Sequence, residues 1–217
     1  MRYGYFLIAC LLASSSAVSA SQSNITSDEM PSRFLPGKYF EYKAQFYLKK
    51  KDYRISLEMS KLASYWGIKT AQYIVGILYF TGNGIAEDKP RGAAWLRIAT
   101  EHKNPLAERA LALANEEMTL QQRTEAEAIW RELDVKYGDA VTLPRARAYF
   151  EAEKRNATGS MVGFVGAMRV ISADGVTSGT NYYANQQKEF DAFVEENFGH
   201  GHVDVEPIEQ LDTPASH

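Results

Sequence analysis

The sequence of 217 residues contains one cysteine, Cys10, and only seven prolines, and it has no excess of positive charge. A single cysteine allows no disulfide within the chain, so packing alone must stabilise the fold. The formal net charge is −3, and the longest basic run is Lys49-Lys50-Lys51. Nucleic-acid surfaces need clustered Lys and Arg. We therefore expect no nucleic-acid partner and assign the three lysines to a solvated helix end.

After residue 20 the sequence lacks any apolar run long enough to cross a membrane. Residues 1–20 have the outline of a secretory signal peptide, with Arg2 before an apolar stretch and small residues that end at Ala20. We expect cleavage near Ala20 and a periplasmic or secreted protein without a membrane span. Cys10 ends a Leu-Ile-Ala-Cys sequence similar to a lipoprotein processing box. Lipid attachment at Cys10 is a less favoured alternative, because this cysteine lies inside the apolar stretch.

The rest of the chain divides by composition into four parts. Residues 21–36 are polar and are predicted to form a flexible leader. Residues 37–154 have apolar positions at helical spacing and are predicted to be helical throughout. Residues 155–198 form a C-terminal extension, in which 161–171 predicts one or two strands or an extended arm and 183–198 predicts a helix. Residues 199–217 form a polar tail.

Helix boundaries are marked by capping residues. The predicted N-caps are Asp52, Asp88, Asn104 and Thr119, the last with Gln122 in a capping box. Gly67 and Gly82 predict helix ends, and Pro144 predicts the start of a shorter seventh helix. In the first helix, near residues 37–49, Tyr39, Tyr42, Phe46 and Tyr47 fall on one side. Short links between such helices predict antiparallel neighbours.

Several positions repeat at an interval of 36 residues. Asp52 and Asp88 are separated by this interval, and so are Ala71 and Ala107. A period near 36 with two helices per unit is typical of an α/α solenoid. We therefore predict an all-α fold: about three antiparallel helix pairs and the small C-terminal extension.

One unit, residues 71–106, is the best formed of the series. It matches a pattern of alanine, glycine, tyrosine, a Gly-x-Gly loop, aspartate and tryptophan at Ala71, Gly76, Tyr79, Gly82, Gly84, Asp88, Trp95 and Ala99. In these residues it resembles the Sel-one-like repeat family, relatives of tetratricopeptide repeats. Gly92 stands where that family usually has alanine. The resemblance implies a non-enzymatic scaffold that binds a protein or peptide.

No group of residues in the sequence predicts catalysis. His200 and His202, followed by Asp204 and Glu206, lie in a terminal tail and provide no preorganised set of ligands. Ser160 lacks a partner histidine or acid in a recognisable arrangement. We therefore predict no catalytic, cofactor-binding or metal-binding residues.

The sequence favours an exported scaffold or adaptor of the bacterial cell envelope that mediates protein–protein interactions as a monomer or weak oligomer. We expect its contacts on exposed faces of the first helix of each pair, at Gln45, Lys49, Gln72 and Glu108. Residues 161–198 would either cap the array or meet the partner. The alternatives are an envelope hydrolase with its site in the C-terminal extension and a lipid-anchored adaptor.

Overall fold

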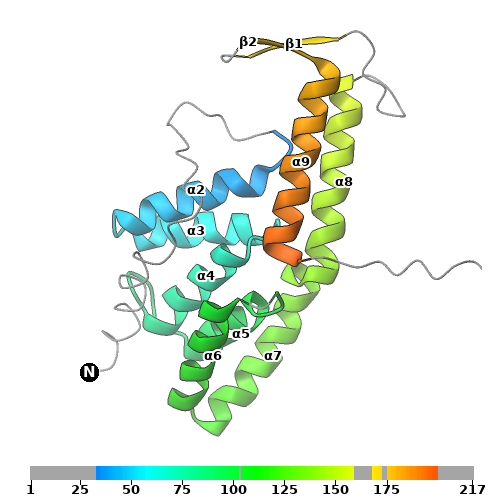
Figure 1. Cartoon of the computed structure of the whole chain (residues 1–217). Helices are drawn as coiled ribbons and strands as arrows, with labels where there is room; N and C mark the ends of the chain where they lie inside the picture. Colours follow the sequence, from blue (N-terminus) through cyan, green and yellow to red (C-terminus); the bar gives the residue numbers. More distant parts are fainter. Residues whose placement is uncertain (1–32, 103, 159–167, 173–174, 200–217) are drawn as a thin grey trace, which may run out of the picture.

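A computed structural model describes residues 33–102, 104–158, 168–172 and 175–199 (Figure 1). The predicted signal peptide with Cys10, most of the predicted leader and the residues after Gly199 lie outside these ranges. The described elements are α2 (Pro36–Lys49), α3 (Tyr53–Ser64), α4 (Lys69–Thr81), α5 (Lys89–Ala99), α6 (Pro105–Glu117), α7 (Leu120–Tyr137), α8 (Asp139–Thr158), β1 (Arg169–Ser172), β2 (Gly175–Ser178) and α9 (Gly179–Phe198). The predicted all-α class is confirmed, and the helix pairs pack as in an α/α solenoid.

Four helices begin where the sequence predicted. Their N-caps are Asp52, Asp88, Asn104 and Thr119, and each side chain accepts a backbone hydrogen bond from the first turn. At α4 the predicted end is also confirmed, since the helix stops at Gly82, which adopts φ 66°. Gly67 takes φ 84°, but α3 ends earlier, at Ser64. These local signals therefore define four helix starts and one helix end in the described structure.

Helices α4 and α5 pack closely against each other. A Cβ atom on Gly76 would lie 2.8 Å from Leu96 Cγ, and one on Gly92 would lie 2.6 Å from the backbone nitrogen of Phe80. Both distances are too short for a real contact, so alanine at position 76 would displace Leu96, and alanine at position 92 would displace the backbone of α4. The close approach explains why position 92 holds a glycine and not a larger residue.

Helix α8 corrects one prediction. The expected short helix starting at Pro144 is wrong, because α8 begins at Asp139 and contains Pro144 in its interior. The backbone N–H of Thr142 donates to the carbonyl of Gly138 at 3.0 Å, so helical bonding is established before the proline. Pro144 removes one hydrogen bond of the following turn without ending the helix.

The C-terminal extension contains a hairpin and a long helix. Strands β1 and β2 pair antiparallel, with Ile171 opposite Val176, and they lie beyond the ends of α8 and α9 that are farthest from the α4–α5 pair (Figure 1). Strand β2 was not predicted. Helix α9 starts at Gly179, four residues before the predicted start, and Ser178 caps it. The predicted strand or arm at 161–167 lies outside the described residues.

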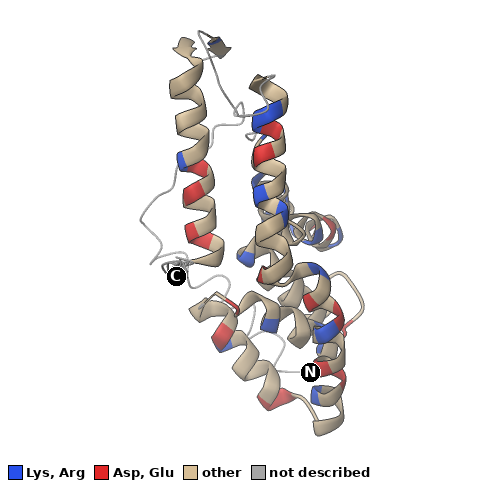
Figure 2. Ribbon diagram, turned by 90° about the vertical axis from the view of Figure 1, so that its right-hand side faces the viewer, with Lys and Arg blue, Asp and Glu red and all other residues tan. Residues whose placement is uncertain are grey.

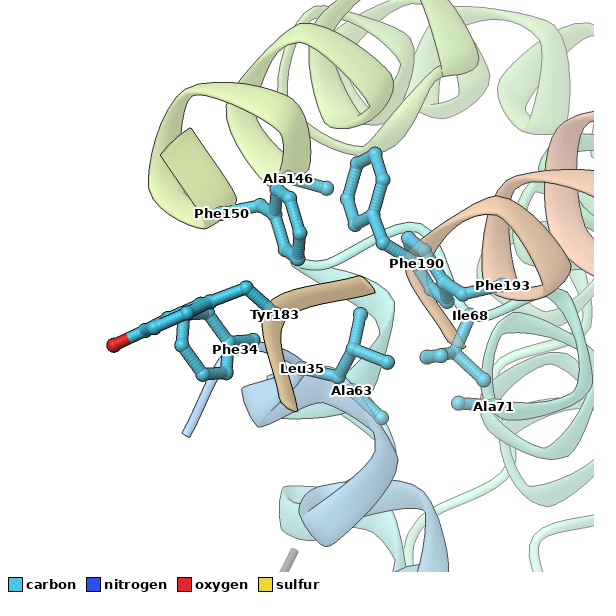
Figure 3. Packing of buried hydrophobic residues seen from close by; sticks show 10 residues of the cluster. All are labelled: Phe34, Leu35, Ala63, Ile68, Ala71, Ala146, Phe150, Tyr183, Phe190 and Phe193. Atoms are coloured by element: carbon cyan, nitrogen blue, oxygen red, sulfur yellow. The ribbon is translucent and has the colours of Figure 1, made fainter. Parts of the chain in front are cut away.

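The two ends of the described chain share one hydrophobic core (Figure 3). Phe34, which precedes α2, packs against Phe150 of α8 and Tyr183 of α9, with ring centroids 5.6 and 6.1 Å apart. The rings of Phe150 and Phe190 stack at 4.4 Å. Helix α9 thus covers apolar side chains of the helical array. This packing is what we expect if the C-terminal extension caps the array. Within the described part of the chain, no helix has the length and apolar composition to span a bilayer.

Candidate binding surface

Helix α2 exposes three aromatic side chains along one side. Tyr39, Tyr42 and Phe46 are 39%, 41% and 36% exposed. Their spacing of three and then four residues places them one above another on the helix. Exposed aromatic rings in a row are uncommon on a monomer surface and are typical of sites that meet another molecule.

The opposite side of α2 explains why these rings face outward. It carries the buried residues Gly37, Glu41 and Ala44. A Cβ atom on Gly37 would lie 2.7 Å from Trp66 Cβ, and the hydroxyl of Ser56 donates to the carbonyl of Ala44 at 2.8 Å. Small residues therefore set a close contact between α2 and its neighbours, and Phe40 is the aromatic residue of α2 that packs against the core on that side.

Lysines accompany the exposed rings. The Nζ atom of Lys50 lies 4.4 Å from the centre of the Phe46 ring, and that of Lys43 lies 5.7 Å from the centre of the Tyr39 ring. Both are cation–π contacts, which orient the ammonium groups over the rings. We call Tyr39, Tyr42, Phe46, Lys43 and Lys50 the α2 surface.

The only acid on α2 does not neutralise this surface. Glu41 is buried, accepts a hydrogen bond from Thr70 and pairs with Lys38 at 3.3 Å. Burial lowers the pKa of Lys38, but the carboxylates of Glu41 and Glu196 outweigh this effect and raise the pKa above its ordinary value. Lys38 therefore stays charged at neutral pH. The α2 surface is aromatic and positively charged in a chain whose net charge is −3.

A second polar feature is a buried charge cluster at the junction of α4, α8 and α9. The ammonium of Lys69, with a side chain 4% exposed, lies 2.9 Å from Glu101 and 2.5 Å from Asp139. Partial burial raises the pKa of Glu101 to about 7, although the charge of Lys69 lowers it. The backbone N–H of Lys69 donates to Asn197 of α9 at 3.0 Å. Perturbed acids beside a lysine can mark active sites, but here the groups bind one another and join three helices.

A groove lies between α5, α6 and α7. Its volume is about 440 Å³, and Arg97, Asn115, Arg123 and Glu127 are among the residues that line it. Arg97 pairs with Glu127 and stacks over Trp130, with its guanidinium carbon 3.6 Å from the ring centre. The arginine is therefore already occupied by two neighbours.

The four predicted contact residues differ in exposure. Gln45, Lys49 and Glu108 are exposed. Gln72 is wrong as a contact residue: it is fully buried, and its side-chain amide donates to the carbonyl of Tyr137 at 3.0 Å. The cause is that α4 is packed on several sides, so it has little free face. His200, His202 and Ser160 lie outside the described residues, and the described ranges contain no group of three or more His, Cys, Asp or Glu side chains that could hold a metal ion.

The sequence places these aromatic residues on one side of the first helix, but it does not show that this side is exposed. The signal was the pairing of those rings with lysines, opposite Gly37 and Ala44. The chain is thus an all-α protein of packed helix pairs with a cationic aromatic surface on its first described helix. No family model, curated protein or solved structure matches it.

Proposed function

We propose that this protein is an exported, non-enzymatic scaffold or adaptor of the bacterial cell envelope that holds a protein or peptide partner. The observation that carries the proposal is the α2 surface. In arrays of helix pairs, each unit buries its apolar face on the next, and terminal units are ordinarily polar outside. Helix α2 is the first helix of the described array and instead presents three aromatic rings.

The composition of this surface supports protein binding. Tyrosine is enriched in the centres of protein interfaces because its ring buries a large area while its hydroxyl remains satisfied. Few rotatable bonds also lower the entropy lost when such side chains are fixed. The surface is modest in size, which suits a single segment of a partner.

We also propose that the protein is exported and that it is related to Sel-one-like repeat proteins. The signal-peptide outline of residues 1–20 supports export, and the residues of the unit 71–106 support kinship with Sel-one-like repeats. The mass of the exported protein tests the first point: a mature chain that begins at Ser21 is expected. A lipid-modified chain that begins at Cys10 would instead establish the lipid-anchored alternative.

The experiment for the function is chemical crosslinking in the native envelope, followed by identification of the attached proteins. It compares the wild type with the double variant Tyr42→Ser/Phe46→Ser. The matched control is Leu120→Ser/Val135→Ser, which removes two exposed apolar side chains from α7 (77% and 74% exposed). We expect a defined set of crosslinked proteins that is lost in the α2 variant and retained in the control. Identical sets in all three proteins, or no specific protein with the wild type, would contradict the proposal.

A further inference from the structure

The C-terminal end of α9 lies beside the N-terminal end of α2. The ammonium of Lys38 on α2 lies 2.5 Å from the carboxylate of Glu196, in the last turn of α9. Lys38 lies one helical turn before Tyr42, which belongs to the α2 surface. The chain therefore leaves the described structure three residues after Glu196, which contacts the first turn of α2.

The end of α9 is acidic where it meets the basic helix. Glu189, Asp191, Glu195 and Glu196 lie in its second half, and Figure 2 shows acidic residues gathered toward one end of this helix. Residues 36–51, in contrast, contain five lysines and one acid, the buried Glu41. The contact between Lys38 and Glu196 is one realised pair between these two oppositely charged segments.

The sequence after α9 continues the same character. Residues 203–212 read Val-Asp-Val-Glu-Pro-Ile-Glu-Gln-Leu-Asp, with four acids and no Lys or Arg. Apolar residues alternate with the acids at 203, 205, 208 and 211. Such a segment is complementary to the α2 surface in both respects, because apolar side chains can pack on aromatic rings and carboxylates can form ion pairs with lysines.

The lengths are compatible with contact inside one molecule. Thirteen residues from 200 to 212 span up to about 43 Å when extended, whereas α2, with 14 residues, is about 21 Å long. A segment attached beside its site also has an effective concentration on the order of 1 mM. Binding within the molecule is therefore favoured over binding to a second copy.

We propose that residues 203–212 occupy the α2 surface of the same molecule and are displaced by a partner segment of similar acidic and apolar character. This inference deepens the proposed function and rests on it for the role of the surface. The tail would thereby set a threshold affinity, since a partner must compete with an attached ligand.

The test measures binding of a labelled synthetic peptide, residues 200–217, by fluorescence anisotropy. Three forms of the exported chain are compared: the wild type, a tail variant Asp204→Asn/Glu206→Gln/Glu209→Gln/Asp212→Asn, and that tail variant combined with Tyr42→Ser/Phe46→Ser. We expect the tail variant to bind the peptide. For a peptide Kd of about 100 µM, competition by the native tail would weaken binding to the wild type about tenfold. The combined variant should lose binding, while adding Leu120→Ser/Val135→Ser instead should leave it unchanged.

Three outcomes would overturn the inference. One is failure of the tail variant to bind the peptide, and another is equal binding by the wild type and the tail variant. The third is a dimer in the wild type that dissociates in the tail variant, since the tail would then bind a second copy. Unfolding curves of all forms verify that the substitutions leave the fold intact. These results do not depend on envelope proteins, so the tail contact can fail while the crosslinking experiment still supports a scaffold.

Discussion

Helices α2 and α4 each begin a helix pair and each carry several aromatic residues, but they place them in different surroundings. In α4, Phe80 is buried, and Ile77 and Phe80 join a core with Leu96 of α5. In α2, Tyr42 and Phe46 face outward, while Gly37 and Ala44 form the contact side. Small residues, more than large ones, therefore indicate which side of a helix packs against its neighbour. Large apolar residues opposite such a side are available for another molecule.

The largest effect is expected inside the α4–α5 region, from Trp95→Ala. Trp95 is buried, and its ring centre lies 4.6 Å from that of Tyr137 in α7. Removal of a buried tryptophan leaves a cavity and costs about 4 kcal/mol of unfolding free energy. Urea denaturation followed by circular dichroism measures the loss. A loss below about 1 kcal/mol would mean that α5 and α7 are not packed as described.

Gly92→Ala comes next and tests the tight contact directly. The new methyl group would meet the backbone of Phe80, so overpacking should cost about 2 kcal/mol despite the better helix propensity of alanine. The same denaturation experiment decides the sign. An increase in stability, which propensity alone would give, would show that α4 and α5 lie farther apart.

Pro144→Ala should act in the opposite direction. The proline is exposed inside α8, and alanine would restore a helical hydrogen bond without loss of buried surface. We expect a gain of about 1 kcal/mol in unfolding free energy. The midpoint of thermal unfolding should rise accordingly. No gain, or a loss, would support the shorter helix that the sequence predicted.

Glu101 provides a pH-dependent comparison. Because the pKa of Glu101 is raised to about 7 in the folded protein, the folded state holds this proton more tightly than the unfolded state. Stability from this group therefore falls as pH rises from about 4.5 to about 7. The variant Glu101→Gln has no such proton, so the difference in unfolding free energy, wild type minus variant, should decrease across this window. Urea unfolding at pH 5, 6, 7 and 8 measures it, and a constant difference would contradict the burial of this carboxylate.

The smallest effect on stability is expected on the α2 surface. In the tail variant, whose residues 203–212 should no longer bind the α2 surface, Tyr42→Ser and Phe46→Ser each replace an exposed side chain. Each should therefore change the unfolding free energy of that variant by less than about 0.5 kcal/mol. Against the loss expected for Trp95→Ala, this contrast separates a binding surface from a core. A loss of 2 kcal/mol or more would place these rings in the interior of the folded protein.

Local chemistry made much of the fold predictable. Asp52, Asp88, Asn104 and Thr119 could be recognised because a cap needs only its own helix turn, and Gly82 because its backbone angle suits few other residues. The helix start predicted at Pro144 was wrong, because proline is common in first turns but can also lie inside a helix. Whether a helix continues past a proline depends on packing by distant residues. Strand β2 was not predicted because its four residues are too few to show a periodic pattern.

The candidate surface was less predictable, because exposure depends on contacts between helices. Gln72 reads as a polar, outward residue in the sequence, but it is enclosed near Tyr137 of α7. Tyr42 and Phe46 fall on one side of the predicted first helix, and the sequence alone does not say whether that side is exposed, as it is in the structure. The period of the hydrophobic pattern identifies the helices, and only three-dimensional packing decides which faces remain free.

The core shared by the two ends of the described chain has a consequence for the timing of synthesis. Phe34 and Tyr183 are in ring contact, although 149 positions separate them in the sequence. At about 5–20 residues per second, translation of that interval takes on the order of 10 s. During this time Phe34 has no partner from α9, whereas α4 and α5 can already pair. Folding is thus expected in two stages, with the second delayed until nearly the whole chain has been made.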